Sequence, residues 1–323
     1  MNEFDIIEKY FAPLTDADLS SGLKDDVARL PTAATDTVSI VTADTIIEGV
    51  HFLATDPLDT VAQKLMRVNV SDVVAKGGQP RTAILCVSWP KTRPIEDIAV
   101  FAEGLTRDLR YFGVRLLGGD TTRTPGPMTL SLTLIGECGA SGPVTRSGAK
   151  AGDDIWCTGV IGDGYLGLKC LTGDLQLTGD LRDGVVNAYR LPAPAVDAAQ
   201  IIKRYASAAI DVSDGLFADL GHILKSSNVG GTLIEKDIPL SPAGSEWLKS
   251  SGQADKLRLL SGGDDYQCLF TASPSMRAAI LKVANNRRLQ LSCIGSIEAG
   301  QDLKILRVDG GLNMVEADGW SHF

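Results

Sequence analysis

Aspartates recur in this sequence where apolar segments give way to glycine-rich or polar ones. The residues in such places are Asp44, Asp120, Asp211, Asp214, Asp264 and Asp265. Asp25-Asp26 follows Gly22, and Asp72 lies inside an otherwise apolar segment with helical spacing. Any one aspartate after a strand is explained by its preference for turns. Asp72 is harder to explain in that way, because aspartate is a poor residue for the middle of a helix.

Several carboxylates that converge on one place repel each other unless cations bind them. Magnesium prefers oxygen ligands and is held by a few carboxylates together with substrate phosphates. The aspartates are not accompanied by histidine or cysteine at metal-ligand spacing, so they favour magnesium and a nucleotide over zinc or iron. Phosphoryl transfer suits such a set of residues, because it depends on positioning and charge neutralisation more than on a protein nucleophile.

Alternating strands and helices must position these aspartates. The first half predicts strands at 38–42, 83–87 and 130–134, and helices at 61–76 and 98–112 that end at Gly77 and Gly113. The second half predicts strands at 155–160, 267–271 and 303–308, one that ends at Ile210, and helices at 216–226 and after Pro194 and Pro274. A glycine-rich and polar stretch at 139–154 separates the halves, so we expect two domains, 1–140 and 141–323.

Composition excludes several classes of protein. The 323 residues are 44% hydrophobic and 22% charged, which suits a folded chain with a sizeable core. A formal net charge of -9 is unfavourable for nonspecific nucleic-acid binding. The sequence has no apolar run of membrane-spanning length and an acidic start, so we expect no membrane association and a cytoplasmic location. The six scattered cysteines are expected to be buried, reduced thiols.

Three other patterns receive a structural interpretation. Gly162-Asp-Gly-Tyr-Leu-Gly167 matches a dinucleotide-binding fingerprint, but no clean second strand follows it, so we interpret it as a tight turn from strand to helix. The sequence contains no G-x-x-x-x-G-K-[ST] phosphate loop. His222 lies on an apolar helical segment, where a structural histidine is the simpler interpretation. Val-Ser-Asp and Gly-Gly-Asp each occur once in both halves (70–72 and 212–214, 118–120 and 262–264), an echo too short to establish duplication.

Taken in order, the acidic motifs resemble those of thiamine-monophosphate kinases, in the superfamily of aminoimidazole ribonucleotide synthetase and selenophosphate synthetase. The matching segments begin with Asp25-Asp-Val-Ala28, Thr42-Ala-Asp-Thr-Ile-Ile-Glu-Gly-Val-His-Phe52, Asn69-Val-Ser-Asp72 and Gly118-Gly-Asp-Thr-Thr122. They continue with Thr145-Arg-Ser-Gly-Ala149, Asp211-Val-Ser-Asp-Gly-Leu216, Ser261-Gly-Gly-Asp-Asp-Tyr266 and Trp320-Ser-His-Phe323.

The resemblance implies a fold, a reaction and roles for residues. It implies an α+β, two-domain synthetase-like fold with a mixed N-terminal α/β domain that forms a homodimer. It implies direct transfer from ATP to thiamine monophosphate with several Mg²⁺ ions. The implied magnesium ligands are Asp26, Thr42, Ala43 through its backbone oxygen, Asp44, Asp72, Asp120, Asp211 and Asp214. The implied ATP contacts are Tyr111, Gly119, Asp120, Arg146 and Ser213, and the implied thiamine-end contacts are His51, Asp264 and Trp320.

Simpler roles stay open for three of these residues. Tyr111 could complete the core face of a helix, Trp320 could pack at the C-terminus, and His51 could be a polar residue at a strand end.

The sequence also departs from the family pattern at four positions. Lys24 stands where glycine is common before the Asp pair, and Ala43 stands where threonine is usual. Asp264 and Gln267 both replace glutamate, and the shorter Asp264 makes the thiamine end the least secure part of the resemblance.

Two alternative functions remain open at this level. The first is another synthetase of the superfamily. Selenophosphate synthetases usually carry a reactive cysteine near the N-terminus, whereas the first cysteine here is Cys86. The related hydrogenase-maturation protein carries a C-terminal cysteine, whereas this sequence ends in His322-Phe323. The second is a noncatalytic nucleotide-binding protein, against which the retained acidic set argues.

Overall fold

The computed structural model describes residues 3–20, 30–251, 253–317 and 319. The chain divides into two compact units. The N-terminal unit comprises Met1–Val73 and Gln79–Gly142, and the C-terminal unit comprises Val74–Gly78 and Pro143–Phe323. The predicted α+β, two-domain class is confirmed. No helix in the described part of the chain is both long and apolar enough to cross a membrane.

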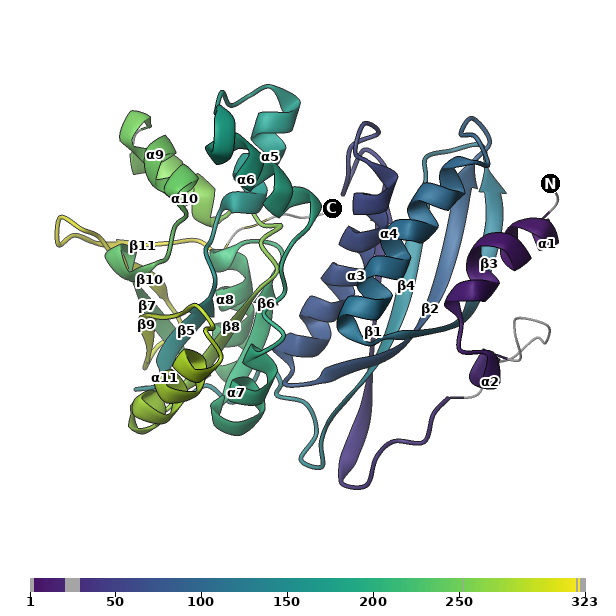
Figure 1. Ribbon diagram of the computed structural model, residues 1–323. Coiled ribbons are helices and arrows are strands. Elements are labelled where there is room, and N and C mark those ends of the chain that lie inside the picture. Colours follow the sequence, from purple (N-terminus) through teal and green to yellow (C-terminus); the bar gives the residue numbers. More distant parts are fainter. Residues whose placement is uncertain (1–2, 21–29, 252, 318, 320–323) are drawn as a thin grey trace. The chain divides into compact units, whose positions relative to one another are not determined.

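A four-stranded sheet forms the centre of the N-terminal unit. Its order is β1 (Thr37–Ile47), β4 (Thr129–Gly139), β2 (Gln79–Pro90) and β3 (Arg115–Thr124). β4 is antiparallel to both neighbours, and β2 and β3 are parallel. Helices α3 (Leu58–Ala75) and α4 (Asp97–Phe112) lie along one face of this sheet (Figure 1). Along β4, Leu130, Leu132 and Leu134 are fully buried and alternate with partly exposed residues, as a strand covered on one face requires.

Short elements precede this sheet. They are α1 (Glu3–Ile6), a π-helical turn (Ile7–Phe11), a 3-10 turn (Ala12–Leu14) and α2 (Ala17–Ser20). A bridge from Thr15 to Leu116 and an ion pair of 3.0 Å between Asp16 and Arg115 hold this segment against β3.

A seven-stranded sheet forms the centre of the C-terminal unit, in the order β11-β10-β7-β9-β5-β8-β6. In chain order its strands are β5 (Asp154–Thr158), β6 (Ala208–Val212), β7 (Gly230–Ile234), β8 (Gln267–Ala272), β9 (Leu291–Glu298), β10 (Leu303–Leu306) and β11 (Leu312–Met314). Every residue of β5 and β6 is buried, which shows that both faces are covered there. Side chains of α8 (Leu216–Ser227) join one core cluster with Ile155, Ile210 and Val212. Helices α7 (Ala198–Tyr205) and α11 (Arg277–Asn286) pack together.

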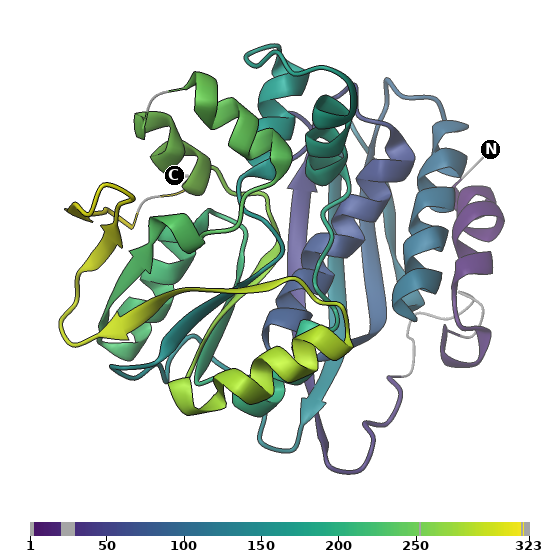
Figure 2. The same cartoon turned by 60° about the vertical axis from the view of Figure 1, so that its left-hand side comes forward.

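Four further helices gather around a smaller apolar cluster of the C-terminal unit (Figure 2). They are α5 (Asp163–Thr172), α6 (Gly179–Arg190), α9 (Pro242–Ser250) and α10 (Gln253–Leu260). Short 3-10 turns at Glu235–Asp237 and Pro274–Met276 complete the described elements. Of the helices in this group, the sequence patterns predicted only the one that follows Gly162.

Several boundaries differ from the prediction in an informative way. β1 continues to Ile47 rather than ending at residue 42, because its ladder with β4 runs on through Asp44 and Leu132. Asp44, Asp120 and Asp211 therefore lie within strands rather than after them. The sequence echo has no structural counterpart, since Asp72 lies in helix α3 whereas Asp214 lies in the turn between β6 and α8.

Candidate functional site

Thr42, Asp44 and Asp72 form the acidic group of the N-terminal unit. Thr42 and Asp44 alternate with exposed neighbours on β1, and the Thr42 hydroxyl donates to Asp72 Oδ2 on α3 at 2.5 Å. Burial, together with the negative charge of Asp72, raises the pKa of Asp44 to about 6. Three of the sequence-predicted magnesium ligands are thus brought together, and the two carboxyls are near enough to repel each other.

A residue outside the predicted set fixes the backbone of this group. The Asp44 N–H donates to Asn69 Oδ1 at 3.1 Å, and Asn69 Nδ2 donates to the Leu65 carbonyl at 2.9 Å. Asn69 is completely buried on α3. Its amide ties the strand that carries one carboxylate to the helix that carries the other.

Asp120 does not join this group within the N-terminal unit. It pairs with Cys86, and the register continues from Cys86 to Ser131 and from Ser131 to Thr45. Side chains alternate along a strand, so this row lies on the face of the sheet opposite Asp44. Asp120 and Cys86 are exposed there, and Cys86 thereby contradicts the expectation of a buried thiol.

Gly119 has a packing requirement of its own, because a Cβ on it would lie 1.6 Å from the Leu85 carbonyl oxygen. Ala43 is exposed and alternates with Thr42 and Asp44, so its side chain also lies on the far face from those two.

Tyr111 and His51 occupy different surroundings. Tyr111, near the end of α4, is 75% exposed, so it does not complete a core face. His51 lies in a tight turn, where its Nδ1 accepts the Ile47 N–H at 3.0 Å and its carbonyl accepts from Lys64 Nζ at 3.1 Å. The hydrogen bond within the turn therefore explains the role of the Nδ1 atom of His51.

The acidic group of the C-terminal unit lies where β6 runs into α8. Asp211 is the buried penultimate residue of β6, and Ser213 and Asp214 form the turn before Gly215. The N–H groups of Ser213 and Asp214 both donate to Asp219 Oδ2, at 3.0 and 3.1 Å. Asp219 comes from the first turn of α8, is only 2% exposed, and was missed by the sequence patterns.

Burial and like-charged neighbours also act on the carboxyls of this group. Burial, followed by the charges of Asp211 and Asp214, raises the pKa of Asp219 to about 8 despite its two N–H donors. Donor atoms of Asp214, Asp219 and His222 lie within 4.8 Å of one another. His222 is exposed on α8 and lies beside the acidic turn, which its apolar sequence context did not indicate.

The loop at 261–266 lies against this turn. Asp264 N donates to the Ser213 carbonyl at 2.8 Å, and Tyr266 N donates to the Val212 carbonyl at 2.7 Å. Gly263, Asp264 and Tyr266 all have left-handed φ values, of 70°, 66° and 51°. Aspartate accepts this conformation more readily than most side chains, which suits Asp264 to its place. A strained backbone held by such contacts is a common feature of functional loops.

Asp265 explains the glycine motif. Its carboxylate accepts the Gly162 N–H at 2.9 Å and the Gly164 N–H at 3.2 Å, at the start of α5. A carboxylate of the protein itself therefore occupies the helix terminus where a dinucleotide phosphate would bind. Burial raises the pKa of Asp265 to about 8 in spite of these donors. The interpretation of 162–167 as a strand-to-helix turn is confirmed.

Two more sequence positions belong to the surroundings of β6. Arg146 is exposed and follows Thr145, whose carbonyl accepts the Ala209 N–H at 2.9 Å, so its backbone runs beside β6. Gln267, one of the departures from the family pattern, accepts from Thr158 Oγ1 at 2.9 Å and donates to the Ala193 carbonyl at 3.5 Å. A glutamate could not make the second contact while charged.

Asp26, Trp320 and the departure Lys24 lie outside the described residues. Gly319, the residue before Trp320, lies against the acidic turn: a Cβ on Gly319 would be 2.3 Å from the Asp214 carbonyl oxygen.

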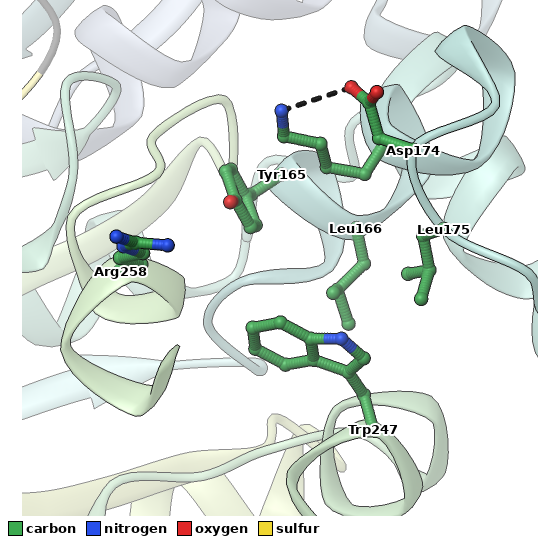
Figure 3. A pocket seen from close by; sticks show the side chains of 7 residues that line it. Tyr165, Leu166, Asp174, Leu175, Trp247 and Arg258 are labelled. Atoms are coloured by element: carbon green, nitrogen blue, oxygen red, sulfur yellow. Dashed lines mark hydrogen bonds and ion pairs between the residues drawn. The ribbon is translucent and has the colours of Figure 1, made fainter. Parts of the chain in front are cut away.

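A pocket of ≈ 210 Å³ opens in the four-helix part of the C-terminal unit (Figure 3). Tyr165 and Trp247 form aromatic walls whose ring centroids are 6.4 Å apart. Lys169 lies over the Tyr165 ring and pairs with Asp174 at 3.1 Å. None of the sequence-predicted site residues that the structure describes lines this pocket.

The donor chemistry of both acidic groups fits magnesium. The ligand atoms that the sequence implied are carboxylate and hydroxyl oxygens, which Mg²⁺ prefers, and His222 adds one nitrogen beside the C-terminal group. In each unit at least one carboxyl has a raised pKa because of burial and a like-charged neighbour. A bound divalent cation would offset that repulsion and hold the carboxylates ionised.

Comparison with known proteins agrees with this donor chemistry. The AIR synthase related protein families match residues 24–138 with their N-terminal domain and 150–307 with their C-terminal domain. The chain belongs to the AIR synthase related family. Within that family it belongs with the thiamine-monophosphate kinases. It is 37% identical to the enzyme of that name from Caulobacter vibrioides over 93% of this chain and 85% of the relative.

Solved structures agree over the whole chain. The crystal structure of thiamine-monophosphate kinase from Stenotrophomonas maltophilia has a TM-score of 0.83 at 34% identity and covers 96% of this chain and 97% of its own. AaThiL complexed with AMPPCP and TMP has a TM-score of 0.80 at 28% identity, with coverage of 99% and 97%.

Proposed function

We propose that this protein transfers the γ-phosphoryl group of ATP to the phosphate of thiamine monophosphate. The bond between the γ-phosphorus and its bridging oxygen breaks, a bond to the acceptor phosphate oxygen forms, and ADP and thiamine diphosphate result. The observation that carries the proposal is the pair of acidic groups, in a chain of the thiamine-monophosphate kinase family. A relative whose structure holds an ATP analogue and TMP together supports the same reaction.

The residues of this chain would act by binding and positioning. Asp44, Asp72, Asp211 and Asp214 would hold several magnesium ions, with Thr42 supplying a hydroxyl oxygen. Magnesium, when bound, supplies positive charge that neutralises the phosphates. Ser213 and Arg146, which flank β6, would contact ATP, and the Arg146 guanidinium suits phosphate oxygens. The thiamine end would meet His51, Asp264 and Trp320. We propose no covalent enzyme intermediate.

We further propose that the protein works as a homodimer formed through its N-terminal unit. The face of the sheet opposite α3 and α4 carries Val41, which is 68% exposed, in the edge strand β1. Asp120 lies on this same face, so Asp120 would serve a nucleotide where two copies meet. Gly119 and Tyr111 would contact that nucleotide from the same β3 strand and from the end of α4. Sedimentation equilibrium of the protein and of Val41→Asp tests this: we expect a dimer that the added charge dissociates.

The direct test of the reaction measures ADP release from Mg-ATP with and without thiamine monophosphate, while chromatography follows thiamine diphosphate. We expect equal amounts of both products, and none after chelation of the metal. ATP binding without turnover would instead favour another acceptor or a noncatalytic role.

A further inference from the structure

Each acidic group contains one buried side chain that the sequence did not indicate as a ligand and that accepts hydrogen bonds from the backbone of the group. In the N-terminal unit, Asn69 accepts the backbone N–H of Asp44. In the C-terminal unit, Asp219 accepts the backbone N–H of Asp214, and of Ser213 beside it. Both side chains come from the helix next to the acidic residues, and they are 0% and 2% exposed.

We propose that Asn69 and Asp219 are positioning residues that set the direction in which the magnesium-binding carboxylates point. The proposal rests on the proposed function for the identity of the metal and the nucleotide. Hydrogen bonds from outside the coordination sphere orient metal ligands, and their loss typically costs roughly 10–100-fold in metal affinity. Asn69 and Asp219 each accept the backbone N–H of a ligand residue. This contact fixes the position of the Cα atom from which the ligand side chain extends.

The two contacts are specific in geometry. Asn69 uses both ends of its amide, because its oxygen accepts from β1 while its nitrogen donates to the Leu65 carbonyl within α3. Asp219 directs one oxygen at two successive N–H groups of a turn in a partly buried place, where backbone donors require acceptors.

Substitution of Asp219 distinguishes a positioning role from direct binding of the metal. Asp219→Ala removes the acceptor, whereas Asp219→Asn retains an amide oxygen that can accept both N–H groups. We expect Asp219→Ala to raise the half-saturating Mg²⁺ concentration by about 10–100-fold. We expect Asp219→Asn to recover most of that loss, and excess Mg²⁺ to restore kcat in both. Asn69→Ala is expected to behave like Asp219→Ala.

Two control variants match the test variants in burial and bonding. Asp153 is 6% exposed, and its Oδ2 also accepts two hydrogen bonds, from the Lys150 N–H and the Ser207 hydroxyl. Gln63 is buried on α3 and donates to Asp108 at 2.7 Å. Asp153→Ala and Gln63→Ala should lower the melting temperature while leaving the Mg²⁺ requirement unchanged.

The measurement is Mg²⁺-dependent binding of the non-hydrolysable analogue AMPPCP by calorimetry, followed by the Mg²⁺ dependence of ADP release. The binding assay needs no acceptor, so a wild-type protein that binds AMPPCP but makes no thiamine diphosphate would fail the proposed function and still test this proposal. Wild-type Mg²⁺ dependence in Asp219→Ala and Asn69→Ala would overturn it. Equal losses in Asp219→Asn and Asp219→Ala would also overturn it for Asp219, which would then be a ligand itself. If Asp219→Ala does not fold, as circular dichroism reports, Asn69→Ala decides.

Discussion

The two acidic groups are built on different kinds of backbone. In the N-terminal unit the carboxylates stand on a strand and a helix, Asp44 on β1 and Asp72 on α3, and the Asn69 side chain supplements the regular hydrogen bonds of these elements. In the C-terminal unit Asp214 stands on a turn, whose N–H groups need a buried carboxylate as acceptor. Both groups should be sensitive to loss of their ligands and of the buried acceptor, Asn69 or Asp219, whereas only the group on a turn should also be sensitive to strain in a neighbouring loop.

The largest effect is expected from a ligand of the N-terminal group. Asp72→Asn should lower activity by about 10³-fold. The substitution removes a charge that would hold a metal ion, and such an ion stabilises the transition state by several kcal/mol. It should also weaken Mg-dependent AMPPCP binding, with little change in the melting temperature. Unchanged AMPPCP affinity would show that the Thr42–Asp72 pair has only a structural role.

A backbone change in the C-terminal group should act on stability. Gly263 has φ +70°, and a Cβ there would lie 2.5 Å from the Ser213 carbonyl oxygen. Gly263→Ala should therefore cost roughly 2–5 kcal/mol, the sum of left-handed strain and overpacking. Gly113, with φ +65° and no atom within 4 Å of its Cβ position, is the control, and its alanine variant should cost about 1–2 kcal/mol. Urea unfolding measures the free energy of unfolding of both variants. Equal decreases would mean that the loop at 261–266 relaxes around the added methyl group without an energetic penalty.

A substitution of Asp264, the proposed contact to the thiamine end of the substrate, should have a smaller effect on activity. Asp264→Asn keeps the size of the side chain and its tolerance of a left-handed backbone but loses the charge. We expect the KM for thiamine monophosphate to rise by about 10-fold, because hydrogen bonds to charged groups exceed neutral ones by about 1–1.5 kcal/mol. The KM for ATP should stay constant. Asp264→Glu, which restores the residue usual in the family, should keep the charge contact. An unchanged KM for thiamine monophosphate in Asp264→Asn would place Asp264 outside the substrate site.

The last effect concerns the dependence of stability on pH. The pKa of Asp265 is raised from 3.8 to about 8, so between these values the native state holds a proton that the unfolded state has released. Stability should therefore fall as pH rises through this window, by up to about 1.4 kcal/mol per pH unit from this residue. Asp265→Asn should reduce the difference between urea unfolding free energies at pH 5 and pH 7.5. An unaltered difference would show that the two glycine N–H groups keep Asp265 ionised.

Local patterns in the sequence predicted much of the fold. The apolar spacing of 98–112 and the glycine after it predicted α4, which ends at a left-handed Gly113. The alternation at Leu130, Leu132 and Leu134 predicted β4. Helices α6, α9 and α10 were missed because they are short and contain few apolar residues, which meet only a small cluster.

The residue types alone predicted the chemistry of the site. Aspartates without histidine or cysteine at metal-ligand spacing in the sequence indicate magnesium and phosphate, and this inference does not depend on the fold. Which aspartates meet was decided only by tertiary structure. Strand register placed Asp120 on the face opposite Asp44. Burial gave Asn69 and Asp219 their partners, because a backbone N–H near the core takes the nearest acceptor in space, and a sequence does not state what is near.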